Sequence, residues 1–264
     1  MPWLPDFQNA AELARRQTHA AGHADPVGQY IVALTGGDPH AIEDAWPERV
    51  VVFDPRAGEV RGHHDLRDFV HRSRDLLAQF QAHLDAARKR IVVPGRAVVE
   101  LLGHVTFDGT QRPWPVAIVA ESHDDSVVFR SYFSRRPTEG QRFPRPSILP
   151  GGAAVPGGVV GWHLEALAAG DVEAVLATFG PGAYLRETDE RTHRGGAELR
   201  AYLSRVGSVE LQPCVVTDDG SACVVEFNCL RLGGREMSPQ AGLVAYERGA
   251  DGLLAAVRIY GDLA

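Results

Sequence analysis

The sequence predicts an α+β protein built from two copies of one domain, and two observations support this prediction. Residues 27–70 align without a gap on residues 160–203, with 11 identities over 44 positions, where unrelated sequences of ordinary composition share about three. In each copy, helical patterns come first and strand patterns come last. Helices followed by a meander of long strands are typical of a curved antiparallel sheet wrapped around helices. We therefore expect an internal duplication of an α+β unit.

The helical part of the first copy is expected over residues 9–23, 27–36 and 39–46. The second and third of these helices break at Gly36 and Gly37, and the following Asp38 can cap the next helix. Asp171 holds the same position in the second copy. We expect both aspartates to be structural.

Strand patterns make up the rest of each copy. A short strand over residues 50–53 leads through a turn into a helix over 63–79, where apolar residues recur at near-helical spacing. Longer strands close the first copy, and matching strands close the second; they are expected over residues 97–107, 114–122, 127–134, 222–232, 241–248 and 253–261.

The segment between the copies, residues 135–158, contains five Pro and five Gly, so it is expected to be an extended connector. The sequence therefore predicts a first domain with its leading helix over residues 1–137, a connector over 138–157 and a second domain over 158–264.

Composition limits the possible partners and the location. The net charge is −7 and no basic stripe is visible, which argues against a nucleic-acid or anionic-membrane partner. Cys214, Cys223 and Cys229 lack metal-type spacing and are interpreted as reduced thiols. No apolar run is long enough to cross a membrane, and the first residues lack the apolar core of a secretory signal. We expect a soluble, cytoplasmic protein.

Three motifs of the first copy and one of the second carry a resemblance to a known family. They are YIVALTGGD at residues 30–38, VFDP at 52–55, Arg61-Gly62, and LLAAVRIYGD at 253–262. On these residues the chain resembles the nuclear-transport-factor-2-like superfamily, which includes SnoaL-like polyketide cyclases and ketosteroid isomerases. The resemblance implies two cone-shaped domains, each with an apolar pocket between its first helices and the inner face of its sheet.

In the first copy, the resemblance to ketosteroid isomerases points to Tyr30 and Asp54. It implies an oxyanion-stabilising role for Tyr30 and a general-base role for Asp54, while the second acid of that site is absent, because its position falls near Ala117 or Ile118. A carboxylate sunk in an apolar pocket has a raised pKa and becomes a competent base near neutrality. Alternatively, Asp54 ends its strand in an Asx turn and Tyr30 is a core tyrosine.

In the second copy the same positions hold His163 and Glu187, flanked by Trp162 and Arg186. A carboxylate facing an imidazole could act as an acid–base pair, with Trp162 and Arg186 contacting the substrate. The alternative interpretation is a boundary histidine and a surface ion pair between Arg186 and Glu187.

Four polar residues on predicted central strands are further candidates for substrate binding. Glu226 and Asn228 share one face of their strand, and Glu226 repeats Glu100, which shares a face with His104. Polar side chains at such positions either line a cavity or lie at a packed sheet interface. The sequence leaves both alternatives open.

No metal and no cofactor are expected, because the histidines lack HxH or HExxH spacing and no phosphate-binding loop is present. The leading hypothesis is cofactor-free acid–base catalysis (enolisation, cyclisation, isomerisation or dehydration) on a carbonyl-containing, polyketide-like small molecule, slightly favouring the second copy as the reactive one. The alternatives are a non-catalytic ligand-binding or accessory protein, and one active copy with the other as scaffold. A monomeric pseudo-dimer or a homodimer is expected.

Overall fold

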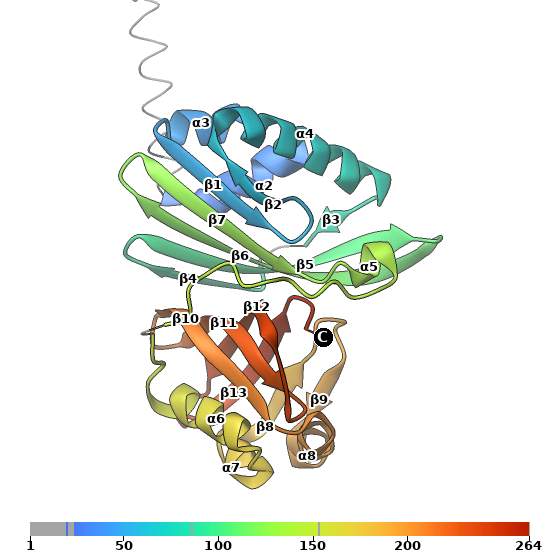
Figure 1. The fold of residues 1–264 in the computed structure, drawn as a ribbon, viewed down its shortest axis with the longest axis vertical. Helices are drawn as coiled ribbons and strands as arrows, with labels where there is room; N and C mark the ends of the chain where they lie inside the picture. The colour runs from blue at the N-terminus through green and yellow to red at the C-terminus, as the bar shows by residue number, and fades with distance from the viewer. Residues whose placement is uncertain (1–19, 21–23, 86, 153, 264) are drawn as a thin grey trace, which may run out of the picture.

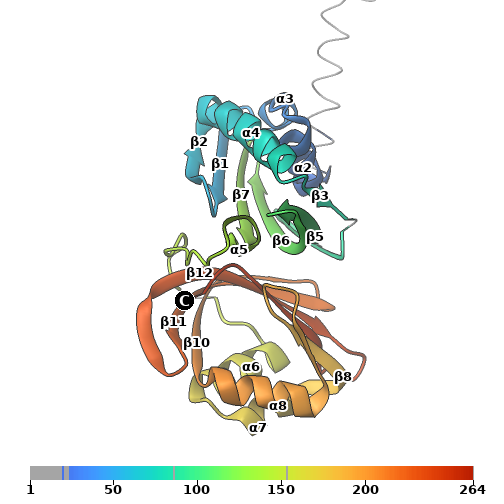
Figure 2. The same ribbon diagram turned by 90° about the vertical axis from the view of Figure 1, so that its right-hand side faces the viewer.

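The computed structural model describes residue 20 and residues 24–85, 87–152 and 154–263. These residues form two α+β units (Figures 1 and 2). We call helices α2–α4 with strands β1–β7 the first unit, and helices α6–α8 with strands β8–β13 the second unit. The leading helix expected over residues 9–23 falls outside the described residues, apart from residue 20.

The first unit has a seven-stranded sheet in the order β2-β1-β7-β6-β5-β3, with β4 also paired to β5. Strands β1 and β7 are parallel, and the other pairs are antiparallel. Its elements are α2 (Pro26–Gly36), α3 (His40–Ala45), β1 (Arg49–Asp54), β2 (Gly58–Arg61), α4 (Gly62–Gln79), β3 (His83–Leu84), β4 (Lys89–Val93), β5 (Arg96–Phe107), β6 (Thr110–His123) and β7 (Ser126–Phe133).

The second unit repeats this arrangement in a six-stranded sheet of order β10-β11-β12-β13-β8-β9, in which β13 and β8 form the parallel pair. Its elements are α6 (Gly158–Ala169), α7 (Val172–Ala177), β8 (Phe179–Arg186), β9 (Thr192–Arg194), α8 (Gly195–Val206), β10 (Val209–Asp218), β11 (Ala222–Leu232), β12 (Arg235–Arg248) and β13 (Leu254–Tyr260). Two sheets of matching strand order fit a tandem arrangement.

The expected breaks between the first helices are confirmed. Gly37 and Gly170 end α2 and α6 with φ of 74° and 71°, a left-handed conformation that favours glycine. The carboxylate of Asp38 then accepts a hydrogen bond from the His40 N–H, and that of Asp171 accepts one from the Ala174 N–H, each at 3.0 Å. Both side chains therefore satisfy amides at the start of the next helix.

The described residues form three apolar cores. One lies between the first sheet and α2–α4, another between the second sheet and its helices. The third lies where the outer faces of the two sheets meet, and includes Val119, Tyr132, Val224, Leu243 and Tyr260. The sheets therefore occupy the middle of the molecule, with helices α2–α4 outside one sheet and α6–α8 outside the other (Figures 1 and 2).

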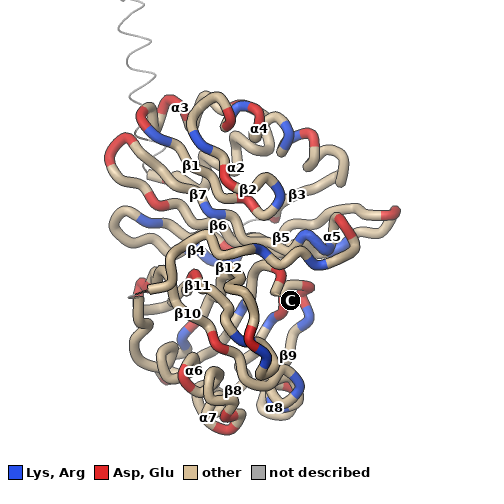
Figure 3. The backbone as a smooth tube through the Cα atoms, in the orientation of Figure 1, with Lys and Arg blue, Asp and Glu red and all other residues tan. Residues whose placement is uncertain are grey.

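In the part of the chain that the structure describes, two buried ion pairs cross the interface between the sheets. Arg130 Nε and Nη2 donate to Glu226 at 2.6 and 2.9 Å, and the Tyr132 hydroxyl donates to the same carboxylate at 2.7 Å. The other pair repeats these contacts with the units exchanged: Arg258 donates to Glu100 at 2.6 and 2.9 Å, and Tyr260 at 2.7 Å. Charged positions accordingly occur along the central strands as well as on the surface (Figure 3).

The connector is less extended than expected, because a short helix, α5 (Arg136–Glu139), forms near its start. Farther along it runs beside β12, where the Ala241 N–H donates to the Arg145 carbonyl at 2.8 Å and the Ser147 N–H donates to the Pro239 carbonyl at 3.1 Å. Among the described residues, none of the helices combines the length and the apolar character that a membrane span requires.

Candidate functional site

The first unit contains a cavity of about 280 Å³ between α2, α4 and the inner face of its sheet, just below the usual range for small-molecule sites. Its wall is mainly apolar, and its main apolar residues are Leu34, Phe69, Leu76, Trp114, Ile118 and Phe133. Asp54 and Ser131 are polar groups in this wall. The cavity therefore offers an apolar molecule a few hydrogen-bonding partners.

Asp54 ends β1 and is 8% exposed. Its Oδ1 accepts hydrogen bonds from the backbone N–H groups of Arg56 at 2.8 Å and Ala57 at 3.0 Å, which confirms the Asx-turn interpretation. Both hydrogen bonds are made at Oδ1. The turn therefore leaves Oδ2 for other contacts, and the same side chain lines the cavity.

The pKa of Asp54 lies above its ordinary value. Burial is the largest cause, and it outweighs the two backbone hydrogen bonds and the charges of Arg145 and Arg56, which act in the opposite direction. Because a base works best when its pKa is near the working pH, this shift moves Asp54 toward the range useful for proton abstraction at neutrality.

Tyr30 lies behind the cavity wall. It is fully buried in α2, stacks on Phe129 with ring centroids 4.4 Å apart, and its hydroxyl lies 3.5 Å from Ser131 Oγ. Burial and then the charge of Asp54 raise the pKa of Tyr30, so its hydroxyl stays protonated. Since Ser131 lines the cavity and Tyr30 does not, the structure corrects the expected direct contact of Tyr30 with a ligand.

Arg145, like Ser131, is a residue near this site that sequence reasoning missed. Its Nη1 donates to the Ser131 carbonyl at 3.0 Å, while its buried Nη2 has no hydrogen-bond partner among the described residues. Arg145 and Asp54 also line a common surface depression on the side of the turn. A single arginine between two prolines of a connector carries no local signal of such a position, which depends on how the connector folds back.

The second unit has a much smaller cavity, about 80 Å³, with an almost wholly apolar lining. His163 lies in its wall, and His163 Nδ1 is 2.8 Å from Thr178 Oγ1. Because that hydroxyl donates its own hydrogen to the Val175 carbonyl at 2.6 Å, Nδ1 must carry the ring proton. Burial lowers the pKa of His163 to about 3, so the ring is a poor base at neutral pH.

Glu187 does not pair with His163. Its Oε1 lies 2.8 Å from His193 Nε2, and Arg191 and Arg205 lie within 4 Å of the same carboxylate. Arg186 pairs with Glu190 at 3.7 Å, not with Glu187. The expected acid–base pair in the second copy is therefore corrected to two separate contacts.

The remaining candidates also lie away from both cavities. Trp162 is 64% exposed on α6, and Asn228 Nδ2 donates to the Leu149 carbonyl of the connector at 3.0 Å. Glu100 and Glu226 lie in the sheet interface described above, which decides between the two alternatives left open by the sequence. We therefore correct their expected role in substrate binding to a role in packing.

His104 likewise lies on the outer face of the first sheet, where it neighbours His83 and Asp85. These three residues form the one group of His, Cys, Asp and Glu side chains in the described part of the chain that is arranged to hold a metal ion. The expectation of no metal site depended on spacing along the sequence, whereas this group is assembled from β3, the residue that follows it and β5.

Comparison with protein families matches residues 27–144 to the model described as a SnoaL-like domain. Similar solved structures include an NTF2-like protein of unknown function from Cytophaga hutchinsonii, 12% identical, covering 39% of this chain and 87% of its own, with a TM-score of 0.34. A candidate polyketide cyclase from Sinorhizobium meliloti is 22% identical, with coverages of 38% and 92% and a TM-score of 0.33. SalBIII, an epoxide hydrolase/cyclase-like enzyme in pyran ring formation in salinomycin, is 15% identical, with coverages of 40% and 88% and a TM-score of 0.34. Comparison with curated proteins found no match.

Proposed function

Since residues 27–144 match the model of a SnoaL-like domain, we propose that the first unit binds a small, largely apolar carbonyl compound and transfers a proton within it, without a cofactor. The observation that supports this proposal is Asp54, a buried carboxylate of raised pKa in the wall of an apolar cavity. Enolisation, isomerisation and cyclisation of a polyketide-like molecule all begin with such a proton transfer.

In the proposed step, Asp54 Oδ2 takes a proton from the carbon next to the substrate carbonyl, and the electron pair of that C–H bond moves toward the carbonyl oxygen. Oδ1 remains bound to the Arg56 and Ala57 amides, which holds the carboxylate in place. The Ser131 hydroxyl donates to the developing enolate oxygen, and the Tyr30 hydroxyl behind it donates to Ser131 Oγ. Return of the proton from Asp54 to another carbon completes an isomerisation.

The second unit is proposed to be a scaffold that arose by tandem duplication. Its cavity is much smaller, and burial keeps His163 neutral. Its Glu187 carboxylate lies within hydrogen-bond distance of His193. We propose domain limits at residues 1–137 and 158–264 with the connector between them. The sequence slightly favoured the second copy as the reactive one, whereas this proposal assigns the chemistry to the first.

Proton abstraction can be tested before the substrate is identified. Exchange of α-protons for deuterium is followed by NMR in D₂O for a panel of small cyclic and bicyclic ketones with the full chain. Asp54→Asn keeps an acceptor for the turn but removes the base, so catalysed exchange should fall at least about 100-fold. Asp44→Asn, at an exposed position on α3, is the matched control and should catalyse ketone exchange as fast as the unmodified protein.

The outcome separates the two classes of function. Loss of exchange in Asp54→Asn with unchanged ketone binding supports catalysis. Ketone binding without exchange in any variant would overturn the catalytic proposal and leave a ligand-binding protein, since Asp54 then serves only the turn. His163→Ala should catalyse ketone exchange at the unmodified rate. Tyr30→Phe should slow this exchange, because it removes the hydroxyl that supports Ser131 as a hydrogen-bond donor to the substrate.

A further inference from the structure

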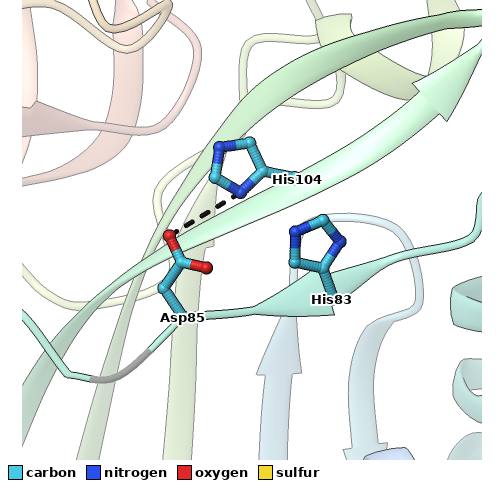
Figure 4. Close-up of side chains that lie close together, drawn as sticks. All are labelled: His83, Asp85 and His104. Atoms are coloured by element: carbon cyan, nitrogen blue, oxygen red, sulfur yellow. Dashed lines mark ion pairs between the residues drawn. The ribbon is translucent and has the colours of Figure 1, made fainter.

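A second candidate site lies on the opposite side of the first sheet from the cavity. His83 and His104 are direct partners in the antiparallel pairing of β3 with β5, so their side chains project from the same face of the sheet. Asp85 follows His83 by two positions, which returns it to that face. Figure 4 shows the two imidazole rings and the carboxylate gathered together.

The distances within this cluster are short enough for the three side chains to reach one ion after small rotations. The two rings are nearly parallel, with centroids 4.9 Å apart and an angle of 18° between them. His104 Nδ1 lies 3.7 Å from Asp85 Oδ2, too far for a hydrogen bond. Two ligand atoms of one tetrahedral zinc ion are about 3.4 Å apart. All three ligand atoms of the cluster lie within 4.8 Å of one another.

His104 provides an additional indication. Its Nδ1 is buried, yet it has no hydrogen-bond partner among the described residues, although the residue as a whole is partly exposed. A buried nitrogen without a partner costs free energy. A bound cation would satisfy this nitrogen. The exposed His83 ring and the exposed Asp85 carboxylate can reach the same cation by small rotations.

We propose that His83, Asp85 and His104 bind a divalent transition-metal ion, for which Zn²⁺ is the reference. Two imidazole nitrogens and one carboxylate oxygen suit zinc and its first-row neighbours, and leave a fourth position for water or another ligand. The nitrogen donors disfavour Mg²⁺ and Ca²⁺, which prefer oxygen. This site is separate from Asp54, and the inference does not depend on the proposed function.

Such an ion would connect the short strand β3 to β5. Leu84, between two of the ligands, points to the other face and lines the cavity of the first unit. Metal binding would therefore fix the position of one part of the cavity wall. It would act as a clip between strands, since its ligands belong to two segments about twenty residues apart in sequence.

The test uses the full chain without an affinity tag, titrated with Zn²⁺ by calorimetry at pH 7.5. We expect one ion per chain with a Kd below about 10 µM. The His83→Ala/His104→Ala variant should bind at least about 100-fold more weakly. His71→Ala/His123→Ala, which removes two exposed histidines elsewhere in the first unit, is the matched control and should bind like the unmodified protein.

Two further measurements keep the test decisive. Co²⁺ in place of Zn²⁺ should give the visible absorption of a four-coordinate site, and Asp85→Asn should lose this absorption. Because the Asp85 side chain is about half exposed, this variant should fold like the unmodified protein. Affinity should also fall in acid, because metal binding to these ligands releases protons. Absence of binding at 100 µM Zn²⁺, or equal affinity in the two double variants, would overturn the proposal.

Discussion

Replacing Arg130 with Met should destabilise the protein by about 3–5 kcal/mol, because it leaves a carboxylate buried between the sheets without its cation. Glu226 is 1% exposed and Arg130 is 2% exposed. The guanidinium supplies two of the three hydrogen bonds that reach Glu226 from the other unit, at 2.6 and 2.9 Å. Met retains much of the side-chain volume, so the main loss is the charge, these two bonds and the hydrogen bond that Arg130 Nη2 donates to Glu121 at 2.9 Å.

The same reasoning predicts two related values. Arg258→Met should cost as much as Arg130→Met, because Arg258 holds Glu100 at the same pair of distances. Adding Glu226→Gln to Arg130→Met should recover part of the lost stability and leave a cost of at most about 2 kcal/mol. The reason is that the amide at position 226 carries no charge that would need a cation.

Urea unfolding, followed by both circular dichroism and tryptophan fluorescence, measures these costs and shows whether the two units unfold together. Arg200→Met is the control: Arg200 pairs with Glu173 on the surface, where the loss of an ion pair costs at most about 1 kcal/mol. If Arg130→Met costs no more than this control, or if the double variant is no more stable than the single one, then Arg130 and Glu226 do not form a buried ion pair between the sheets.

Three further predictions concern stability. Burial lowers the pKa of His163 from 6.5 to about 3, so its contribution to the free energy of unfolding is complete above pH 6.5 and is lost as the pH falls. The free energy of unfolding should be roughly 2 kcal/mol lower at pH 5 than at pH 7.5, and this difference should be absent in His163→Leu. Asp54 has its pKa raised, so Asp54→Asn should have a higher Tm than the unmodified protein at pH 8, and this advantage should vanish below pH 3.8 in melting curves; equal melting at both pH values would contradict the burial of its charge. Asp171→Ala should cost about 1 kcal/mol in urea unfolding without changing ketone exchange, and a loss of exchange would refute its structural role.

Most of the element order could be predicted because apolar periodicity depends only on local chain geometry. The helices over 27–36, 39–46 and 63–79 and the six long strands all correspond to elements of the structure within a few residues, apart from the start of β12. Strand β10 was missed, since Pro213 interrupts its pattern. It lies at the edge of its sheet, where a proline can be accommodated because one side of the strand has no partner.

The candidate site was predictable only in part. Asp54 was found because the repeat and the resemblance both pointed to the end of the same strand, and its Asx turn follows from local sequence. Ser131 and Arg145 were missed, because each reaches the site through strand register or the return of the connector. The exchanged roles of Glu100 and Glu226 also needed the sheets to be placed.

The amino-acid sequence by itself determined the α+β class, the repeated order of helices and strands, and which side chains share a face of each strand. These properties follow from short-range periodicity and from capping and turn chemistry. Only the tertiary structure decided what covers each face: Glu100 and Glu226 meet arginines of the opposite unit, and His104 meets His83 and Asp85. The physical reason is that alternation along a strand specifies two faces, whereas the partner of each face is chosen by packing between segments far apart in the chain.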